Sequence, residues 1–216
     1  MLIIGAKGFA KEILEVLHQL KQLEGLAFYD DVTFDSSNLL FNVLPVLKTE
    51  EQVKEHFKKY GNSFSIGIGN PHLRYKLYLK FKNLGGLFCS TISPTAQIGK
   101  YDVEIGAGSN ILSAAIFSNS VKIGKGCIVY YNVIITHDCI VNDFVELSPN
   151  VTLLGNVEIG SYTQIGAGAI ILPKVKIGEN VIVGAGAVVT KDLPDNCVAV
   201  GVPATVIKEL EPLNFQ

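Results

Sequence analysis

The sequence predicts a chain in two parts: a Rossmann-like α/β domain over residues 1–88, then an all-β parallel β-helix over residues 89–216 that ends in a cap. Two observations predict this division. Apolar stretches of strand length alternate with helical patterns in the first part, and aliphatic residues recur every six positions in the second. No apolar stretch approaches the roughly 18 residues that a membrane-spanning helix needs, so no membrane span is expected.

The first part is predicted to alternate strands and helices. The expected strands cover residues 2–5, 26–29 and 64–69, and the expected helices end near residues 20, 60 and 84. Thr49 and Gln52 have the spacing of a capping box, which predicts the start of the second helix. Asn70 and Pro71 are turn residues that end the third strand. This order predicts a small parallel sheet with flanking helices.

The second part carries an uninterrupted repeat of six residues. Every sixth residue from Ile105 to Val189 is Ile, Leu or Val, except Phe117, and the fourth residue after each is small. Neither an α-helix nor a hairpin meander keeps this period, so each repeat is predicted to form a short strand and a corner. Three repeats then close a triangular coil of 18 residues, with the aliphatic side chain inside and glycine tolerating the turn.

The 18-residue coil predicts which side chains stack along the outside of the prism. Residues that precede each buried aliphatic should point outward. On one face these residues form an apolar ladder of Ile116, Ile134, Thr152, Ile170 and Val188. Scattered surface hydrophobes are the alternative explanation, but a contiguous column favours a subunit interface.

His137 is the only histidine of the second part and is predicted at the edge of that apolar face, below Gly155. A neighbouring column carries Gly166-Ala167-Gly168 and Gly184-Ala185-Gly186 on successive coils. Such a strip, almost free of side chains, lets a long thin ligand approach the backbone. Repeat glycines at corners and a structural surface histidine are the alternative interpretations.

The turn after the first strand is a candidate anion site. Gly5 and Gly8 make a Gly-x-x-Gly turn, which is weaker than a full dinucleotide motif. A turn that opens a helix suits a phosphate, because free backbone N–H groups point at the ligand. A turn that needs glycine only for its backbone geometry is the alternative.

Five segments in this order carry a family resemblance: Gly5–Glu12, Asp30–Asp31, Ile66–Asn70, Thr136–Cys139 and Gly201–Ala204. Over essentially its whole length the chain resembles the hexapeptide-repeat sugar acetyltransferases, typified by bacillosamine-type UDP-4-amino-sugar N-acetyltransferase and sialic acid O-acetyltransferase. The resemblance implies a left-handed β-helix, a homotrimer, acetyl-CoA as co-substrate and a sugar-nucleotide-binding role for residues 1–88.

The resemblance also implies roles in the second part. His137 matches the general base, and Asp138 raises its basicity, provided that both lie at a corner. The backbone N–H of Gly155 would lie near the thioester oxygen. Ala167 and Ala185 match positions that contact acetyl-CoA, whose phosphates Lys174, Lys191 or Lys208 would meet. Glu146 stands where bacillosamine-type relatives have a second histidine that contacts acetyl-CoA.

In the first part, the resemblance implies a nucleotide-sugar site. Lys7, Gly8 and Phe9 would contact phosphate or sugar, although bacillosamine-type relatives have histidine in place of Phe9. The acidic pair Asp30 and Asp31 would contact the base or ribose. Gly69 and Asn70 would belong to the nucleotide pocket.

The predicted function is acetyl-CoA-dependent N-acetylation of a nucleotide-linked amino sugar, a UDP- or dTDP-4-amino-6-deoxy sugar, in surface-glycan biosynthesis. O-acetylation of sialic acid or another sugar hydroxyl is the alternative within the same chemistry, because one imidazole serves both acceptors. A non-catalytic scaffold is a further alternative. A γ-class carbonic anhydrase needs three histidines around zinc, which His137 alone does not supply, so no metal is expected.

Composition narrows the partners and the compartment. Twenty acidic and 18 basic side chains give a net charge of −2, which argues against nucleic acid as a partner. The four cysteines have no Cys-x-x-Cys spacing, so reduced thiols and a cytoplasmic location are expected.

Overall fold

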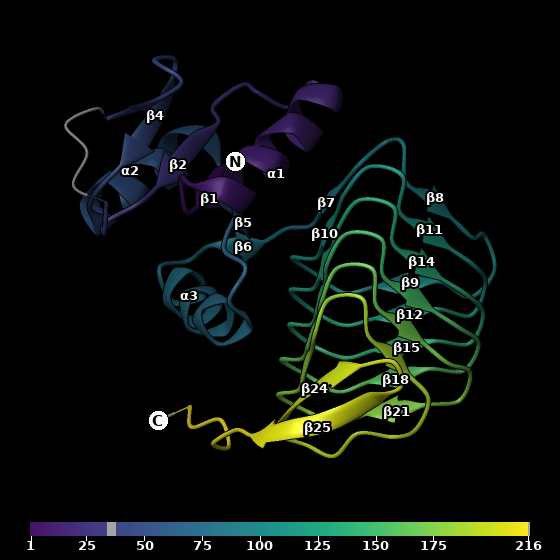
Figure 1. Ribbon diagram of the computed structural model, residues 1–216. Helices are drawn as coiled ribbons and strands as arrows, with labels where there is room; N and C mark the ends of the chain where they lie inside the picture. Colours follow the sequence, from purple (N-terminus) through teal and green to yellow (C-terminus); the bar gives the residue numbers. More distant parts are fainter. Residues whose placement is uncertain (34–37, 216) are drawn as a thin grey trace.

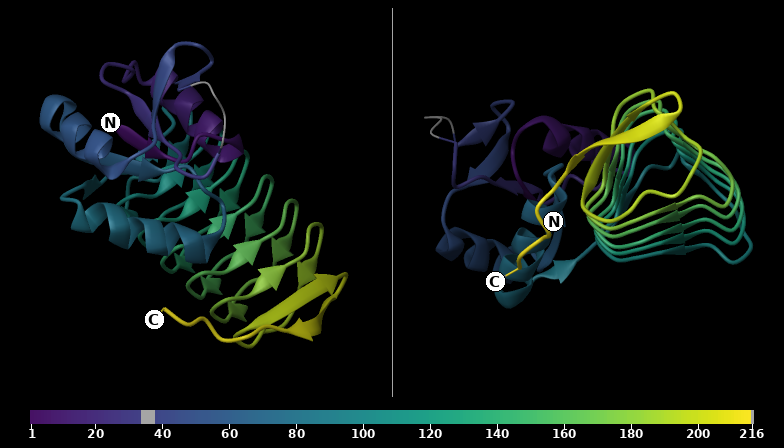
Figure 2. Two further views of the ribbon diagram at one scale, coloured as in Figure 1. Left: turned by 90° about the vertical axis from the view of Figure 1, so that its left-hand side faces the viewer. Right: turned by 60° about the horizontal axis from the view of Figure 1, so that its bottom comes forward.

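A computed structural model describes residues 1–33 and 38–215 of the chain. A left-handed parallel β-helix forms a three-sided prism, and an α/β part lies against one of its sides (Figures 1 and 2). No helix in the described residues is long and apolar enough to cross a membrane.

The α/β part is built on a parallel sheet, as the strand and helix pattern predicts. Its strands run in the order β3-β4-β2-β1-β5-β6, and only the β3–β4 pair is antiparallel. The elements are β1 (Leu2–Ile4), α1 (Gly8–Gln19), β2 (Ala27–Tyr29), β3 (Leu39–Leu40), β4 (Leu44–Leu47), α2 (Glu50–Tyr60), β5 (Ser63–Ile66), α3 (Pro71–Asn83) and β6 (Leu87–Phe88). The capping box of Thr49 and Gln52 at the start of α2 is confirmed.

Strand β5 ends at Ile66, earlier than the sequence pattern predicts. The next residue, Gly67, lies so close to α1 that a Cβ atom there would be 2.6 Å from the Cβ of Ala10. The backbone therefore leaves the sheet to pass the helix, and residues 67–69 form a loop. The short strands β3, β4 and β6 were not predicted, because two to four residues carry little periodicity.

Each side of the prism is a parallel sheet. The docked face, which the α/β part covers, contains β7 (Thr91–Ile92), β10 (Asn110–Ile111), β13 (Ile128–Val129), β16 (Glu146–Leu147), β19 (Gln164–Ile165) and β22 (Ile182–Val183). The apolar face contains β8 (Gln97–Ile98), β11 (Ile116–Phe117), β14 (Ile134–Ile135), β17 (Thr152–Leu153), β20 (Ile170–Ile171) and β23 (Val188–Val189). The charged face contains β9 (Glu104–Ile105), β12 (Lys122–Ile123), β15 (Ile140–Val141), β18 (Glu158–Ile159) and β21 (Lys176–Ile177).

The predicted 18-residue coil is confirmed by the strand register, in which Ile134 pairs with Thr152 and Thr152 pairs with Ile170. The aliphatic repeat fills the interior of the prism, where Ile135, Leu153 and Ile171 are fully buried. Strands β24 (Cys197–Gly201) and β25 (Ala204–Glu209) form an antiparallel pair that extends the docked face after the last coil.

The corners correct one expectation about glycine. The left-handed backbone conformation recurs at every sixth residue from Asp102 to Gly186, which is the third residue after each interior aliphatic. The glycines that directly follow the aliphatics have another role, because a Cβ atom at Gly160 would lie 2.4 Å from the carbonyl carbon of Gly178. These glycines allow neighbouring coils to approach, whereas the turn itself is made two residues later.

The residues that precede the interior aliphatics differ in exposure between faces. On the apolar face, Ile116, Ile134 and Ile170 are each more than one third exposed. On the docked face, Asn110 and Ile128 are fully buried under the α/β part. The outward ladder of the sequence analysis is therefore solvent-exposed only where no second layer covers it.

The α/β part spans the docked face between its two edges. Near one edge, Phe9 of α1 packs on Tyr130 with ring centroids 5.3 Å apart. Near the other edge, Tyr75 of α3 packs on Phe144 with centroids 5.4 Å apart. The C-terminal tail returns to the same place, where the Phe215 ring lies 4.8 Å from that of Tyr75 (Figure 2).

Substitution of Gly160 by Ala should destabilise the β-helix by about 1–3 kcal/mol, because the added methyl group overlaps the backbone of the next coil. The matched control is Gly8→Ala, whose Cβ would meet no atom within 4 Å. Urea unfolding of both variants measures the difference. Equal unfolding midpoints for the two variants would contradict this explanation of the repeat glycines.

Candidate active site

A cavity of about 280 Å³ lies in the α/β part, beside the carboxyl ends of β1, β2 and β5. Because these strands are parallel, the segments that follow them meet at one edge of the sheet. The lining residues come mainly from these segments: Ile4, Gly5, Ala6, Lys7, Tyr29, Asp30, Asp31, Val32, Thr33, Gly67, Ile68, Leu73 and Leu77. An adjoining hollow shares Lys7 and Asp30 and adds the ammonium groups of Lys11 and Lys48.

Asp30 organises one wall of this cavity. Its carboxylate accepts hydrogen bonds from the backbone N–H groups of Val32 and Thr33, at 3.1 and 2.9 Å, and from the Thr33 hydroxyl at 2.6 Å. Burial raises the pKa of Asp30, but the hydrogen bonds from Thr33 and Val32 outweigh it and leave the pKa below its usual value. Asp31 accepts a hydrogen bond from the Tyr29 hydroxyl at 2.9 Å.

Only part of the predicted nucleotide site lines the cavity. Lys7, Asp30 and Asp31 do, whereas Gly8, Phe9, Gly69 and Asn70 do not. The Phe9 ring is buried against Tyr130, the Asn70 side chain accepts a hydrogen bond from the N–H of Leu73 at 2.9 Å, and Gly69 approaches Glu146. These positions belong to helix starts and to the contact with the β-helix.

His137 and Asp138 meet at the edge between the apolar and charged faces. Asp138 has the left-handed corner conformation, with φ of 60°. The corner turns both side chains to the same side, so that His137 Nδ1 lies 2.7 Å from Asp138 Oδ2. This contact confirms the expectation that both residues lie at a corner. A carboxylate on Nδ1 favours the tautomer that leaves Nε2 free to accept a proton.

The imidazole of His137 is exposed and lies against Gly155 of the next coil. The side chain is 62% exposed. A Cβ atom at Gly155 would lie 2.5 Å from His137 Cε1 and 2.7 Å from Nε2. Glycine is therefore required at this position by the ring above it.

The Gly-Ala strip lies on a different edge from His137, which corrects the expectation of neighbouring columns. Ala167 and Ala185 follow β19 and β22, so they lie on the edge between the docked and apolar faces. At Gly168 and Gly186 of this strip, an added Cβ would meet no atom within 4 Å. The strip and His137 thus border the apolar face on its two opposite sides.

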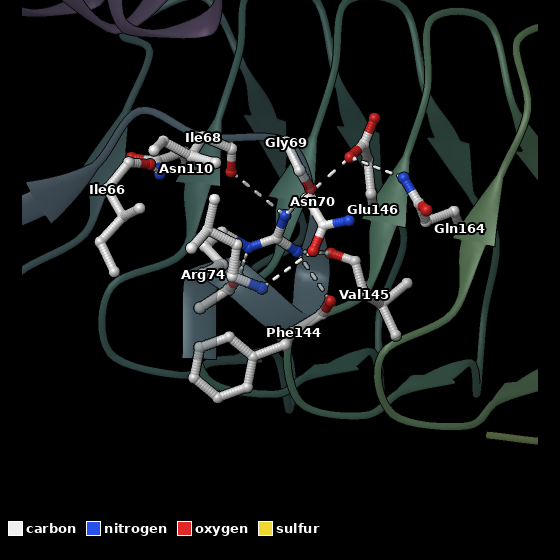
Figure 3. A network of polar contacts seen from close by, with 12 residues as sticks. Ile66, Ile68, Gly69, Asn70, Arg74, Asn110, Phe144, Val145, Glu146 and Gln164 are labelled. Carbon is white, nitrogen blue, oxygen red and sulfur yellow. Dashed lines mark hydrogen bonds and ion pairs between the residues drawn. The ribbon is translucent and has the colours of Figure 1, made fainter. Parts of the chain in front are cut away.

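Glu146 lies on the docked face, away from both edges of the apolar face. Its side chain is 13% exposed, and Oε2 lies 3.9 Å from Arg74 Nη1 and 3.4 Å from Gln164 Nε2 (Figure 3). Burial raises the pKa of Glu146, against the opposing effects of Arg74 and Gln164. Sequence reasoning missed Arg74, because nothing in a helical segment marks an arginine that another part of the chain will bury.

The three-sided shape separates the cavity from His137. The α/β part covers the docked face, and the edge that carries His137 joins the other two faces (Figure 2). In a triangular prism this edge lies opposite the docked face. One chain therefore holds its cavity and its His137–Asp138 pair on opposite sides of the same β-helix. Among the described residues, no group of His, Cys, Asp and Glu side chains is placed to hold a metal ion.

Two family models match the chain. The PglD N-terminal domain matches residues 1–81, and the bacterial transferase hexapeptide model (six repeats) matches residues 156–191.

Solved structures match both parts together. Perosamine N-acetyltransferase from Caulobacter crescentus, in complex with CoA and GDP-perosamine, is 29% identical with a TM-score of 0.87 over 96% of each chain. The acetyltransferase domain of PglB from Neisseria gonorrhoeae is 30% identical (TM-score 0.86), and WeeI from Acinetobacter baumannii is 31% identical (TM-score 0.85). Both matches cover 95% of this chain and 98% of the other.

A pH-dependent penalty should reside in Glu12 of α1, whose pKa is raised by burial and then by repulsion from Glu146. Because the folded protein holds this proton to higher pH than the unfolded chain, stability is lost as the pH rises through the raised pKa. Glu12→Gln should therefore unfold at higher urea concentration than the wild type at pH 8, and at a similar concentration at pH 4. The exposed Glu55→Gln is the control; an equal gain at both pH values would contradict the assignment.

Proposed function

Because this chain belongs to the family of hexapeptide-repeat sugar acetyltransferases and uses acetyl-CoA as co-substrate, we propose that it acetylates the amino group of a nucleotide-linked 4-amino-6-deoxy sugar in surface-glycan biosynthesis. The observation that carries the proposal is the His137–Asp138 pair, exposed on one edge of a β-helix whose α/β part holds a cavity at strand ends.

His137 is the proposed general base. As the sugar nitrogen attacks the thioester carbonyl and the C–N bond forms, Nε2 accepts the proton that the nitrogen loses. Asp138 on Nδ1 stabilises the resulting imidazolium. The C–S bond then breaks, and the imidazolium returns the proton to the CoA sulfur. The backbone N–H of Gly155, directly against the imidazole, is the proposed donor to the developing oxyanion.

Acetyl-CoA is proposed to bind along the Gly-Ala strip. Ala167 and Ala185 would offer backbone groups to the pantetheine arm, since the strip presents open space where other corners present side chains. The cationic side chains of Lys174, Lys191 and Lys208 are the proposed partners of the CoA phosphates. Glu146 retains its proposed role near acetyl-CoA only through the docked face, where it lies.

Residues 1–88 are proposed as the sugar-nucleotide-binding domain, and residues 89–216 as the acetyltransferase domain with its cap. Lys7 would meet the phosphates, while Asp30 and Asp31 would bind the ribose or base beside the apolar wall of the cavity. Gly8, Phe9, Gly69 and Asn70 flank the cavity along the chain, so their proposed roles are carried by backbone groups at its rim.

The active site is proposed to form between copies in a homotrimer. One chain holds its cavity and His137 on opposite sides of the prism, so the sugar bound by one copy would have to reach the base of the next. The apolar face, with Ile116, Ile134 and Ile170 exposed between its two edges, is the proposed contact. Packing this face against a neighbour brings an edge with His137 toward the docked α/β part of the other copy.

Release of the CoA thiol tests the reaction. With a panel of UDP-, dTDP- and GDP-linked 4-amino-6-deoxy sugars, together with free and CMP-linked sialic acid, we expect turnover on a nucleotide amino sugar. His137→Ala should lower kcat by about 100-fold or more without changing the oligomer. Turnover only on sialic acid would instead establish O-acetylation, and near-normal kcat in His137→Ala would remove the base assignment.

Coexpression of two inactive chains tests whether the site is shared. One chain carries His137→Ala, and the other carries Lys7→Glu, which repels phosphate. If each site takes its base and its cavity from different copies, random mixing restores about one quarter of the wild-type sites. Each variant expressed alone is the control. Mixed trimers without activity would show that one copy supplies both halves.

A further inference from the structure

Arg74 of α3 has a guanidinium group buried between the two parts of the chain, with its side chain 1% exposed. All three of its nitrogen atoms donate hydrogen bonds to backbone carbonyl groups (Figure 3). A buried arginine with this many fixed acceptors is held in one orientation, because the guanidinium is planar and its donors point in set directions.

The acceptors of Arg74 belong to two separate structures. On one side, Nη1 donates to the carbonyl of Ile68, at 3.4 Å, and to that of Gly69, in the loop after β5. On the other side, Nε donates to Gly126 at 2.9 Å, and Nη2 donates to Phe144 at 2.7 Å, both in β-helix corners. One side chain thus joins the loop of the α/β part to two successive coils.

The start of the same segment is tied to the same face by a second polar contact. Asn110 of β10 accepts a hydrogen bond from the Ser65 hydroxyl at 2.9 Å and donates to the carbonyl of Ile66 at 3.3 Å. All of these groups are buried. Residues 65–69 are therefore attached to the β-helix at both ends, and Gly67 and Ile68 between them line the cavity.

The charge of Arg74 is balanced at the same place. Glu146 Oε2 lies 3.9 Å away, and Gln164 holds that oxygen from the next coil. Burial lowers the pKa of Arg74 to about 10, so the guanidinium remains charged at neutral pH. A buried pair of this kind adds little net stability compared with apolar packing, but it specifies one geometry.

We propose that Arg74 is a positioning residue for acetyl transfer. It fixes the cavity of the α/β part relative to the β-helix by holding Ile68 and Gly69 against the corners at Gly126 and Phe144. The last step rests on the proposed function: if the sugar must reach the base of another copy, a small rotation of the α/β part moves the amine away from that base. Misplacement of reacting groups by about 1 Å can cost 100-fold in rate.

Arg74→Lys tests the proposal, because it keeps a positive charge beside Glu146 but removes the fork that spans both structures. We expect kcat to fall about tenfold or more, while the KM for acetyl-CoA and the calorimetric Kd for the free nucleoside diphosphate stay near their wild-type values. The matched control is Val53→Ala, a buried α2 position that touches neither the loop nor the cavity. It should lower the Tm yet retain normal kcat where the protein is folded.

A second measurement follows the geometry without any turnover. Spin labels at Glu55→Cys on α2 and Glu179→Cys after β21, in a Cys89→Ser background diluted with unlabelled chain, report the distance between the two parts. Arg74→Lys should broaden or shift this distance distribution, and Val53→Ala should leave it unchanged.

The outcomes separate this proposal from the proposed function. An unchanged distance distribution in Arg74→Lys overturns the positioning role, whether or not the wild type is active. The role is also overturned if kcat falls equally in Val53→Ala, or if only the nucleotide-sugar KM rises. A silent wild type across the acceptor panel overturns the proposed function, while a broadened distribution would still support Arg74 as the residue that orients the two parts.

Discussion

The docking of the α/β part on one face of a three-sided prism is the constraint on which the rest of the structure depends. A triangular coil has three faces, and covering one of them buries Asn110 and Ile128, which would otherwise point into solvent. The apolar and charged faces are then left, with His137 on the edge between them. The separation of the cavity from the imidazole follows from this arrangement and not from any local feature of either site.

The contact between the two parts combines apolar and polar packing in different places. Aromatic rings dominate near the two edges of the docked face, where Phe9 meets Tyr130 and Tyr75 meets Phe144. Between them, polar side chains bind backbone groups that would otherwise be buried without partners, as Arg74 does for the corner carbonyls. Apolar contacts tolerate small shifts, whereas a planar fork with fixed acceptors does not. The polar centre is therefore the part of the contact that specifies orientation.

The candidate site was only partly predictable from the sequence. The contact of His137 with Asp138 followed from the position of both residues within the repeat, since the third residue after each interior aliphatic turns the chain. The roles of the glycines were misassigned, because a glycine that makes a turn and one that admits a neighbouring coil look alike in a sequence. The positions of Glu146 and of the Gly-Ala strip relative to His137 depended on which edge each residue occupies around the prism.

The sequence by itself determined the repeat register, the interior of the β-helix, the His137–Asp138 corner and the capping box at Thr49, because each rests on spacing over a few residues or on a strict period. Only the tertiary structure decided which face is docked, which outward residues are buried and what Arg74 binds. Those contacts join segments far apart in the chain, such as Ser65 with Asn110 and Arg74 with Phe144. No local pattern records such pairs, since they arise from the fit of two surfaces that fold separately along the chain.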